Sequence, residues 1–145
     1  MPGAAAQPPP TMTVAEFLRW DDGTDTRYEL IDGHPMAMVP PLEIHGEIVA
    51  TICAALRRRL APPCRPMAEA GIRAEDWRDR FFTADVAVTC APRVADRRHV
   101  AEPVAIFEVL SPSTELHDRG RKVDHYRSLG GVGAIVLVWS TAARV

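Results

Sequence analysis

The sequence has no apolar run long enough to cross a membrane. Its longest run, Val132 to Trp139, has eight residues with one glycine inside it, whereas a membrane-spanning helix needs about 20. The N-terminus also lacks the basic segment followed by an apolar one that marks a secretion signal. We therefore expect a cytoplasmic protein with no membrane partner.

Cysteine is scarce as well. The three cysteines, Cys53, Cys64 and Cys90, lie 11 and 26 residues apart. Neither spacing matches a zinc site, and an odd number cannot form a closed disulfide framework. We expect buried free thiols that pack as small hydrophobic residues.

The positive charge typical of nucleic-acid-binding proteins is missing, since the formal net charge is −2 and the pI is about 6.2. A metal site would weaken this objection, because it concentrates carboxylates while the ion itself supplies positive charge.

Lysine is nearly absent: sixteen of the seventeen cations are arginine, and Lys122 is the exception. Lysine is a compact charge that can be neutralised, so Lys122 could stand where arginine cannot serve. The alternative is that one of the seventeen cations is a lysine by chance.

The size and composition indicate one soluble globular domain. The chain has 145 residues, of which 47% are hydrophobic and 25% charged. Residues 1–11, rich in alanine and proline, predict a disordered tail. Residues 12–145 then form the single domain, which is short at its C-terminal end.

Local patterns predict the first elements. A capping box of Thr13 and Glu16 starts a short helix through Trp20. The dipeptide Asp32-Gly33 between two apolar runs predicts a β-hairpin over about 28–39.

Apolar residues at helical spacing predict a long amphipathic helix over Ile44–Leu60. Its last turn holds Arg57, Arg58 and Arg59, where cations favour the helix dipole; phosphate binding is the alternative role. Strands follow over about 65–75, 81–90 and 103–110, because these runs are rich in β-forming residues.

The remaining elements complete an α/β (α+β) architecture. Ser113 or Thr114 can cap a second helix that runs to about Leu129. The last strand, Ala134 to Trp139, is uniformly apolar, so we expect it at the centre of the sheet, covered on both faces. The order is helix, three strands, helix and strand, preceded by a helix and a hairpin.

Two carboxylates interrupt apolar strands, Asp85 after Ala84 and Glu108 after Phe107. An unpaired buried charge costs several kcal/mol, so a cation, a proton or a metal must compensate each one. Neighbouring strands in sequence usually pair, and the two acids could then share one ion; oxygen ligands favour Mg²⁺ or Mn²⁺. The alternative, one acid paired with an arginine and the other at a fraying strand end, remains open.

The predicted second helix carries Asp118, Lys122 and Tyr126 at spacings of four residues, which form one stripe. Lys122 lies at the margin of the apolar arc and therefore points partly inward. A surface ion pair between Asp118 and Lys122 is the alternative and would contribute little, about 0.3–0.5 kcal/mol.

Several strings together resemble the Uma-type restriction endonuclease family of the PD-(D/E)XK nuclease superfamily. They are YELIDG at 28–33, ADVAV at 84–88, and FEVLSPST at 107–114 followed by Asp118, Lys122 and Tyr126. The resemblance spans roughly residues 12–139. It implies a restriction-endonuclease-like core, helix-strand-strand-strand-helix-strand, with a mixed central sheet.

The resemblance also implies site residues. Asp85 matches the motif aspartate and Glu108 the motif (D/E), and the carbonyl of Val109 would be a further metal ligand. The usual lysine two residues after the acid is absent, and Lys122 on the following helix matches it instead. Glu29 matches a recurrent acid that could complete the site, and Tyr126 would be a positioning residue.

The implied activity is Mg²⁺- or Mn²⁺-dependent hydrolysis of DNA, and many nucleases of the superfamily cut duplexes as homodimers. Two features depart from the family: Ala84 replaces a proline, and the chain stops at Val145 where members usually continue with further strands. The early stop could leave a sheet edge uncovered. Together with the near-neutral charge, it favours an alternative, a catalytically inactive nuclease fold that binds nucleic acid or a protein partner. His45 matches a frequent family histidine, although a capping or solvent role is equally open.

Overall fold

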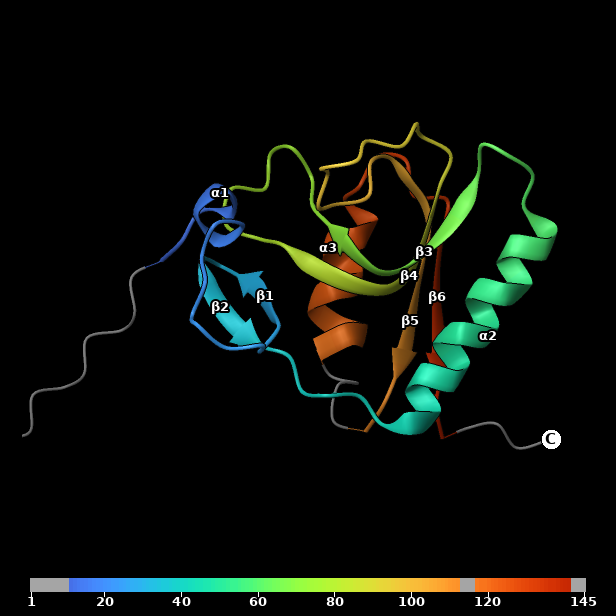
Figure 1. Ribbon diagram of the computed structural model, residues 1–145, viewed down its shortest axis with the longest axis horizontal. Helices are drawn as coiled ribbons and strands as arrows, with labels where there is room; N and C mark the ends of the chain where they lie inside the picture. Colours follow the sequence, from blue (N-terminus) through green and yellow to red (C-terminus); the bar gives the residue numbers. More distant parts are fainter. Residues whose placement is uncertain (1–10, 113–116, 142–145) are drawn as a thin grey trace, which may run out of the picture. The chain divides into compact units, whose positions relative to one another are not determined.

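The computed structural model describes residues 11–112 and 117–141, which fall into two compact units. Unit 1 comprises Met1–Val39 and Glu75–Phe81, and unit 2 comprises Pro40–Ala74 and Phe82–Val145 (Figure 1). Residues 1–10 of the expected tail lie outside the described residues. The single domain over 12–145 stays a prediction, so each unit is described by itself.

Unit 1 begins with the predicted capping box. The Thr13 side chain accepts the Glu16 N–H at 3.2 Å, and the Glu16 carboxylate accepts the Thr13 N–H at 2.8 Å. Helix α1, Val14–Phe17, is shorter than expected. Trp20 lies beyond its end and packs edge-to-face on Tyr28 with ring centroids 4.8 Å apart, so a tertiary contact replaces the last predicted turn.

The predicted hairpin is confirmed. Strands β1, Tyr28–Ile31, and β2, His34–Ala37, pair antiparallel around Asp32 and Gly33, which have φ angles of 49° and 80°. A side chain at Gly33 would also place a Cβ 2.8 Å from that of Thr11, so the turn requires glycine there.

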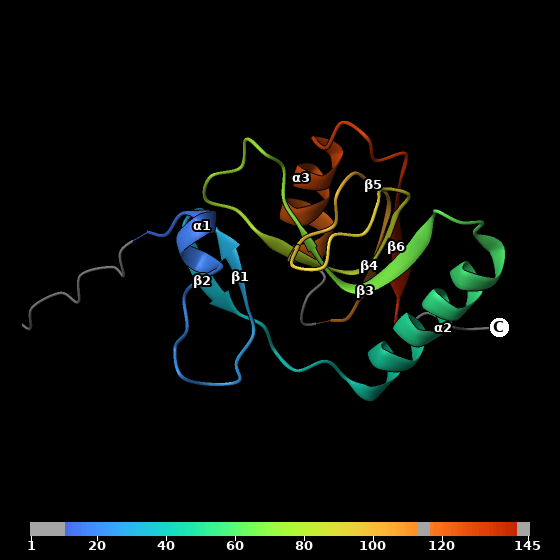
Figure 2. The same ribbon diagram turned by 45° about the horizontal axis from the view of Figure 1, so that its top comes forward.

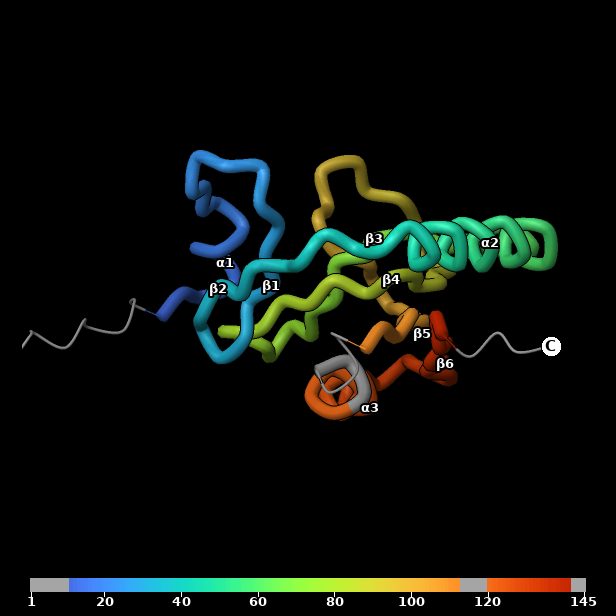
Figure 3. The backbone as a smooth tube through the Cα atoms, turned by 90° about the horizontal axis from the view of Figure 1, so that it is seen from below, coloured from blue at the N-terminus to red at the C-terminus, as the bar shows by residue number. Residues whose placement is uncertain are grey.

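Unit 2 is built on a four-stranded mixed sheet. Its strands are β3, Arg65–Ile72, β4, Phe82–Thr89, β5, Pro103–Leu110, and β6, Ala134–Trp139, in that spatial order. The first three are antiparallel neighbours, and β6 runs parallel to β5. Helix α2, Glu43–Arg59, and helix α3, Val123–Arg127, lie on opposite faces of this sheet (Figures 1 and 3).

The predicted element order and the mixed α+β class are confirmed, but the position of the last strand is not. Among the described residues, strand β6 pairs only with β5 and is an edge strand, with Val136 and Trp139 each 38% exposed. A uniformly apolar run specifies neither which strands pair with it nor how much of it is covered.

The second helix also differs from the prediction. Its expected caps, Ser113 and Thr114, lie outside the described residues, and 117–122 form a π-helix that leads into α3. Single π-helical turns are rare and occur often at functional sites. This one ends at Lys122. Within the described residues, no helix combines the length and apolar character that a membrane crossing requires.

The prediction of three free thiols is wrong for two of them. Cys64 and Cys90 form a disulfide, because each lies one residue beyond the cross-strand pair Arg65↔Thr89 at the end of the β3–β4 ladder. An odd cysteine count does not prevent one pair from forming. Cys53 is free and half-buried, and burial raises the pKa of its thiol.

Candidate active site

The antiparallel ladder between β4 and β5 brings the two candidate acids to neighbouring positions. Its paired residues end at Val86↔Phe107, so the next residue on each strand is Asp85 and Glu108. The ladder opens here, and the Asp85 Oδ2 atom accepts the backbone N–H of Val109 at 2.6 Å.

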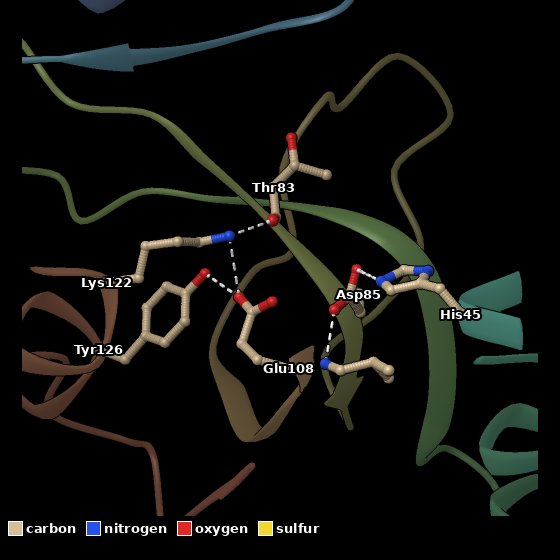
Figure 4. Close-up of polar contacts among 7 residues, drawn as sticks. His45, Thr83, Asp85, Glu108, Lys122 and Tyr126 are labelled. Atoms are coloured by element: carbon tan, nitrogen blue, oxygen red, sulfur yellow. Dashed lines mark hydrogen bonds and ion pairs between the residues drawn. The ribbon is translucent and has the colours of Figure 1, made fainter. Parts of the chain in front are cut away.

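Glu108 is buried and held by two donors from the second helix. Only 1% of its surface is exposed. Its Oε1 atom accepts the Tyr126 hydroxyl at 2.6 Å and lies 3.1 Å from the Lys122 ammonium. That ammonium also donates to the Thr83 carbonyl at 2.8 Å, so strand β4 fixes the lysine head (Figure 4). The charge on Glu108 is therefore compensated by a hydrogen-bonded ion pair.

Asp85 has a more open environment. Its side chain is 21% exposed, and its Oδ1 atom lies 3.0 Å from Nε2 of His45 in the first turns of α2. Figure 4 shows Lys122 and Tyr126 on one side of the acids and His45 on the other. A ligand from solvent could therefore reach Asp85 more readily than the fully enclosed Lys122.

Unit 2 thus brings together five of the residues singled out in the sequence. Glu108, Lys122 and Tyr126 are in direct contact, and Asp85 contacts the backbone of Val109. Lys122 points inward as its place on the helix predicted, with 3% of its surface exposed. Glu29 lies in unit 1, on β1, and its part in the site stays a prediction. The side chain of Asp118 lies outside those described.

Sequence reasoning did not place His45 in the site. A signal was nevertheless present, because His45 is spaced three, four and seven residues from Ile48, Val49 and Ile52 on the apolar face of α2. That face packs toward the sheet and carries the imidazole to β4. The Thr83 carbonyl was also missed, since a backbone contact leaves no mark in the residue type.

The donor types here, carboxylate and carbonyl oxygens, are those that would suit a hard divalent cation that keeps part of its water shell. Two carboxylates lie at neighbouring strand positions, and the carbonyl of Val109 follows Glu108 directly. Within residues 11–112 and 117–141, no group of three His, Cys, Asp or Glu side chains is placed to hold a metal. Mg²⁺ needs no such group, because it is usually bound through one or two carboxylates and retains several waters.

The element order and the mixed sheet define a restriction-endonuclease-like α+β fold. A family model described as "Putative restriction endonuclease" (Uma2) matches residues 14–145. The chain therefore belongs to the Uma2 family, as its motifs predicted.

Two individual proteins are similar to it. The uncharacterized protein slr1290 of Synechocystis sp. is 29% identical over 142 residues, which cover 95% of this chain and 74% of that protein. A crystal structure from Anabaena variabilis, titled a putative nuclease belonging to DUF820, superposes with a TM-score of 0.71 at 20% identity. The match covers 88% of this chain and 74% of the other, and it shows a shared fold.

Proposed function

We propose that this protein is a metal-dependent endonuclease that hydrolyses DNA phosphodiester bonds. The main support is the carboxylate pair of Asp85 and Glu108 at the opening of the β4–β5 ladder, next to the chain's single lysine. Membership of a family described as restriction endonucleases supports the same reaction class.

In this proposal Asp85, Glu108 and the Val109 carbonyl hold Mg²⁺ or Mn²⁺. The ion would polarise the scissile phosphate and activate a water for attack. The Tyr126 hydroxyl orients the Glu108 carboxylate, because it donates to the oxygen that also contacts Lys122. Glu29 remains a candidate additional ligand or base.

Lys122 has two tasks. Its ammonium fixes the Glu108 carboxylate, and it supplies a compact positive charge that can stabilise charge developing on the phosphate or orient the water. Its hydrogen bond to the Thr83 carbonyl keeps the charge in place before substrate arrives. An arginine would have to fit a larger planar group into the same enclosed position.

DNA is the proposed substrate, and a homodimer the proposed assembly for cutting both strands of a duplex. A supercoiled plasmid incubated with Mg²⁺, with and without EDTA, tests the reaction. Asp85→Asn and Glu108→Gln should each reduce cleavage about 100-fold or more, since a metal supplies several kcal/mol to such a transition state. Asp124→Asn, which alters an exposed acid on α3, is the matched control. Cleavage that survives EDTA, or full activity in both site variants, would rule out the mechanism.

A second candidate function is a non-catalytic module that binds nucleic acid or a protein. One observation favours it: each acid already has a side-chain donor, His45 on Asp85 and Lys122 on Glu108. Calorimetry separates the two functions, because DNA binding without any Mn²⁺ binding would support the non-catalytic module. Activity on small phosphodiesters but none on DNA would instead indicate a different phosphoester hydrolase.

A further inference from the structure

Unit 2 contains a second chemically distinct region, away from the two acids. Two adjoining cavities of about 450 and 400 Å³ share Arg57, Arg65 and Arg93 in their walls. The second cavity adds Arg97 and His99. No aspartate or glutamate is among the described residues that line either one. We call this region the arginine cavity and define it by these five residues.

The charge of the arginine cavity is not neutralised by the protein. In the described part of the chain, none of its four arginines forms an ion pair. Arg65 is half-buried and donates to the Ala91 carbonyl at 2.7 Å, so its guanidinium is fixed without losing its charge. Arg57 and Arg93 are exposed and can reach a ligand that enters from solvent. In a chain of net charge −2, this concentration of unpaired cations indicates an anion.

The positive charge of this region also affects His99. Burial lowers the pKa of its imidazole, and the positive charges of Arg73 and Arg97 lower it further. A bound anion would offset those charges and favour the protonated form. Its imidazole is therefore a built-in probe of occupancy.

The arginine cavity is also spaced suitably from the acids. Along β4, Asp85 lies four residues before Thr89, and Thr89 lines the cavity wall. At the rise of a strand, the two residues are roughly 13 Å apart. Helix α2 lies beside β3 (Figure 2). Within α2, the rise from His45, which contacts Asp85, to Arg57 in the cavity wall is roughly 18 Å. Successive phosphates of one strand advance about 3.4 Å along a duplex axis, so the separation corresponds to roughly four or five base pairs.

We propose that the arginine cavity binds phosphate groups of the DNA backbone several base pairs from the scissile bond. This inference rests on the proposed function, because it takes DNA as the substrate. Arginine suits the task, since its planar fork can donate two hydrogen bonds to one phosphate. The contacts position the duplex and carry no sequence preference.

Fluorescence anisotropy with a labelled 20-base-pair duplex in EDTA tests this without cleavage. Binding of the wild type, Arg57→Ala, Arg93→Ala and the double variant is measured across a salt series. Each lost phosphate contact should reduce the slope of log K against log salt by about 0.9 and weaken binding about eightfold at 0.1 M salt. Arg58→Ala is the matched control, because it removes the same charge from the same helical turn but does not line the cavity.

The outcomes separate this inference from the proposed function. Reduced slopes in the cavity variants alone support the arginine cavity, even if the plasmid assay shows no cleavage and the nuclease proposal fails. Three results would overturn it: a wild-type salt slope in the double variant, a reduction of slope and affinity in Arg58→Ala equal to that in the cavity variants, or no duplex binding at low salt. Saturable shifts of the His99 resonances with inorganic phosphate, together with variant-insensitive DNA binding, would assign the cavity to a small anion and also overturn it.

Discussion

Replacing Lys122 by methionine removes the partner of a buried charge while keeping much of the side chain's volume. Glu108 is 1% exposed, and the Lys122 ammonium lies 3.1 Å from its Oε1 atom. The Tyr126 hydroxyl remains as a donor at 2.6 Å, but it carries no charge. Removing one member of a buried pair typically costs about 3–5 kcal/mol of unfolding free energy. For a chain of this size, that lowers the melting temperature by about 6–20 °C.

The assay is urea unfolding of Lys122→Met followed by circular dichroism. The double variant Glu108→Leu/Lys122→Met should regain most of the lost stability, because it leaves no charge behind. Arg127→Met is the control on the same helix: its pair with Asp124 is exposed, so the midpoint should not change. If Lys122→Met unfolds at the wild-type urea concentration, the buried ion pair does not exist as described. The assigned role of the lysine would then be wrong.

Three further predictions concern other parts of unit 2. His45→Ala should weaken Mn²⁺ binding about tenfold in calorimetry, since residues that orient a metal ligand usually contribute 10–100-fold; unchanged affinity would make the imidazole a bystander. Alkylation of the unfolded, unreduced chain should label Cys53 alone, and labelling of Cys64 or Cys90 would contradict the disulfide. An NMR titration should place the pKa of His99 below its ordinary 6.5, because burial and two nearby arginines disfavour its charge. Its contribution to stability should then be complete above about pH 6.5 and decline as the pH falls toward the folded-state pKa.

Local patterns with one dominant physical cause predicted the fold well. The hairpin follows from the positive φ angles that Asp32 and Gly33 tolerate, and the long helix follows from apolar spacing over 44–60. The acids were conspicuous because Asp85 and Glu108 interrupt apolar strands, and sequential pairing of β4 with β5 then made them neighbours.

What could not be predicted depends on tertiary arrangement. The edge position of β6 and the disulfide between Cys64 and Cys90 both follow from which strands pair and in which register. The contact of His45 with Asp85 depends on how α2 packs on the sheet. The π-helix over 117–122 departs from the 3.6-residue period on which the helix prediction relied.

The central claim is that one divalent ion binds between Asp85 and Glu108. At 15.9 kDa the chain suits NMR, so substoichiometric Mn²⁺ added to ¹⁵N-labelled protein tests the claim directly. The account predicts selective broadening of the amides around Asp85 and around Glu108 and Val109, and loss of that broadening in Asp85→Asn. Broadening confined to exposed acids elsewhere, or identical in the variant, would contradict it.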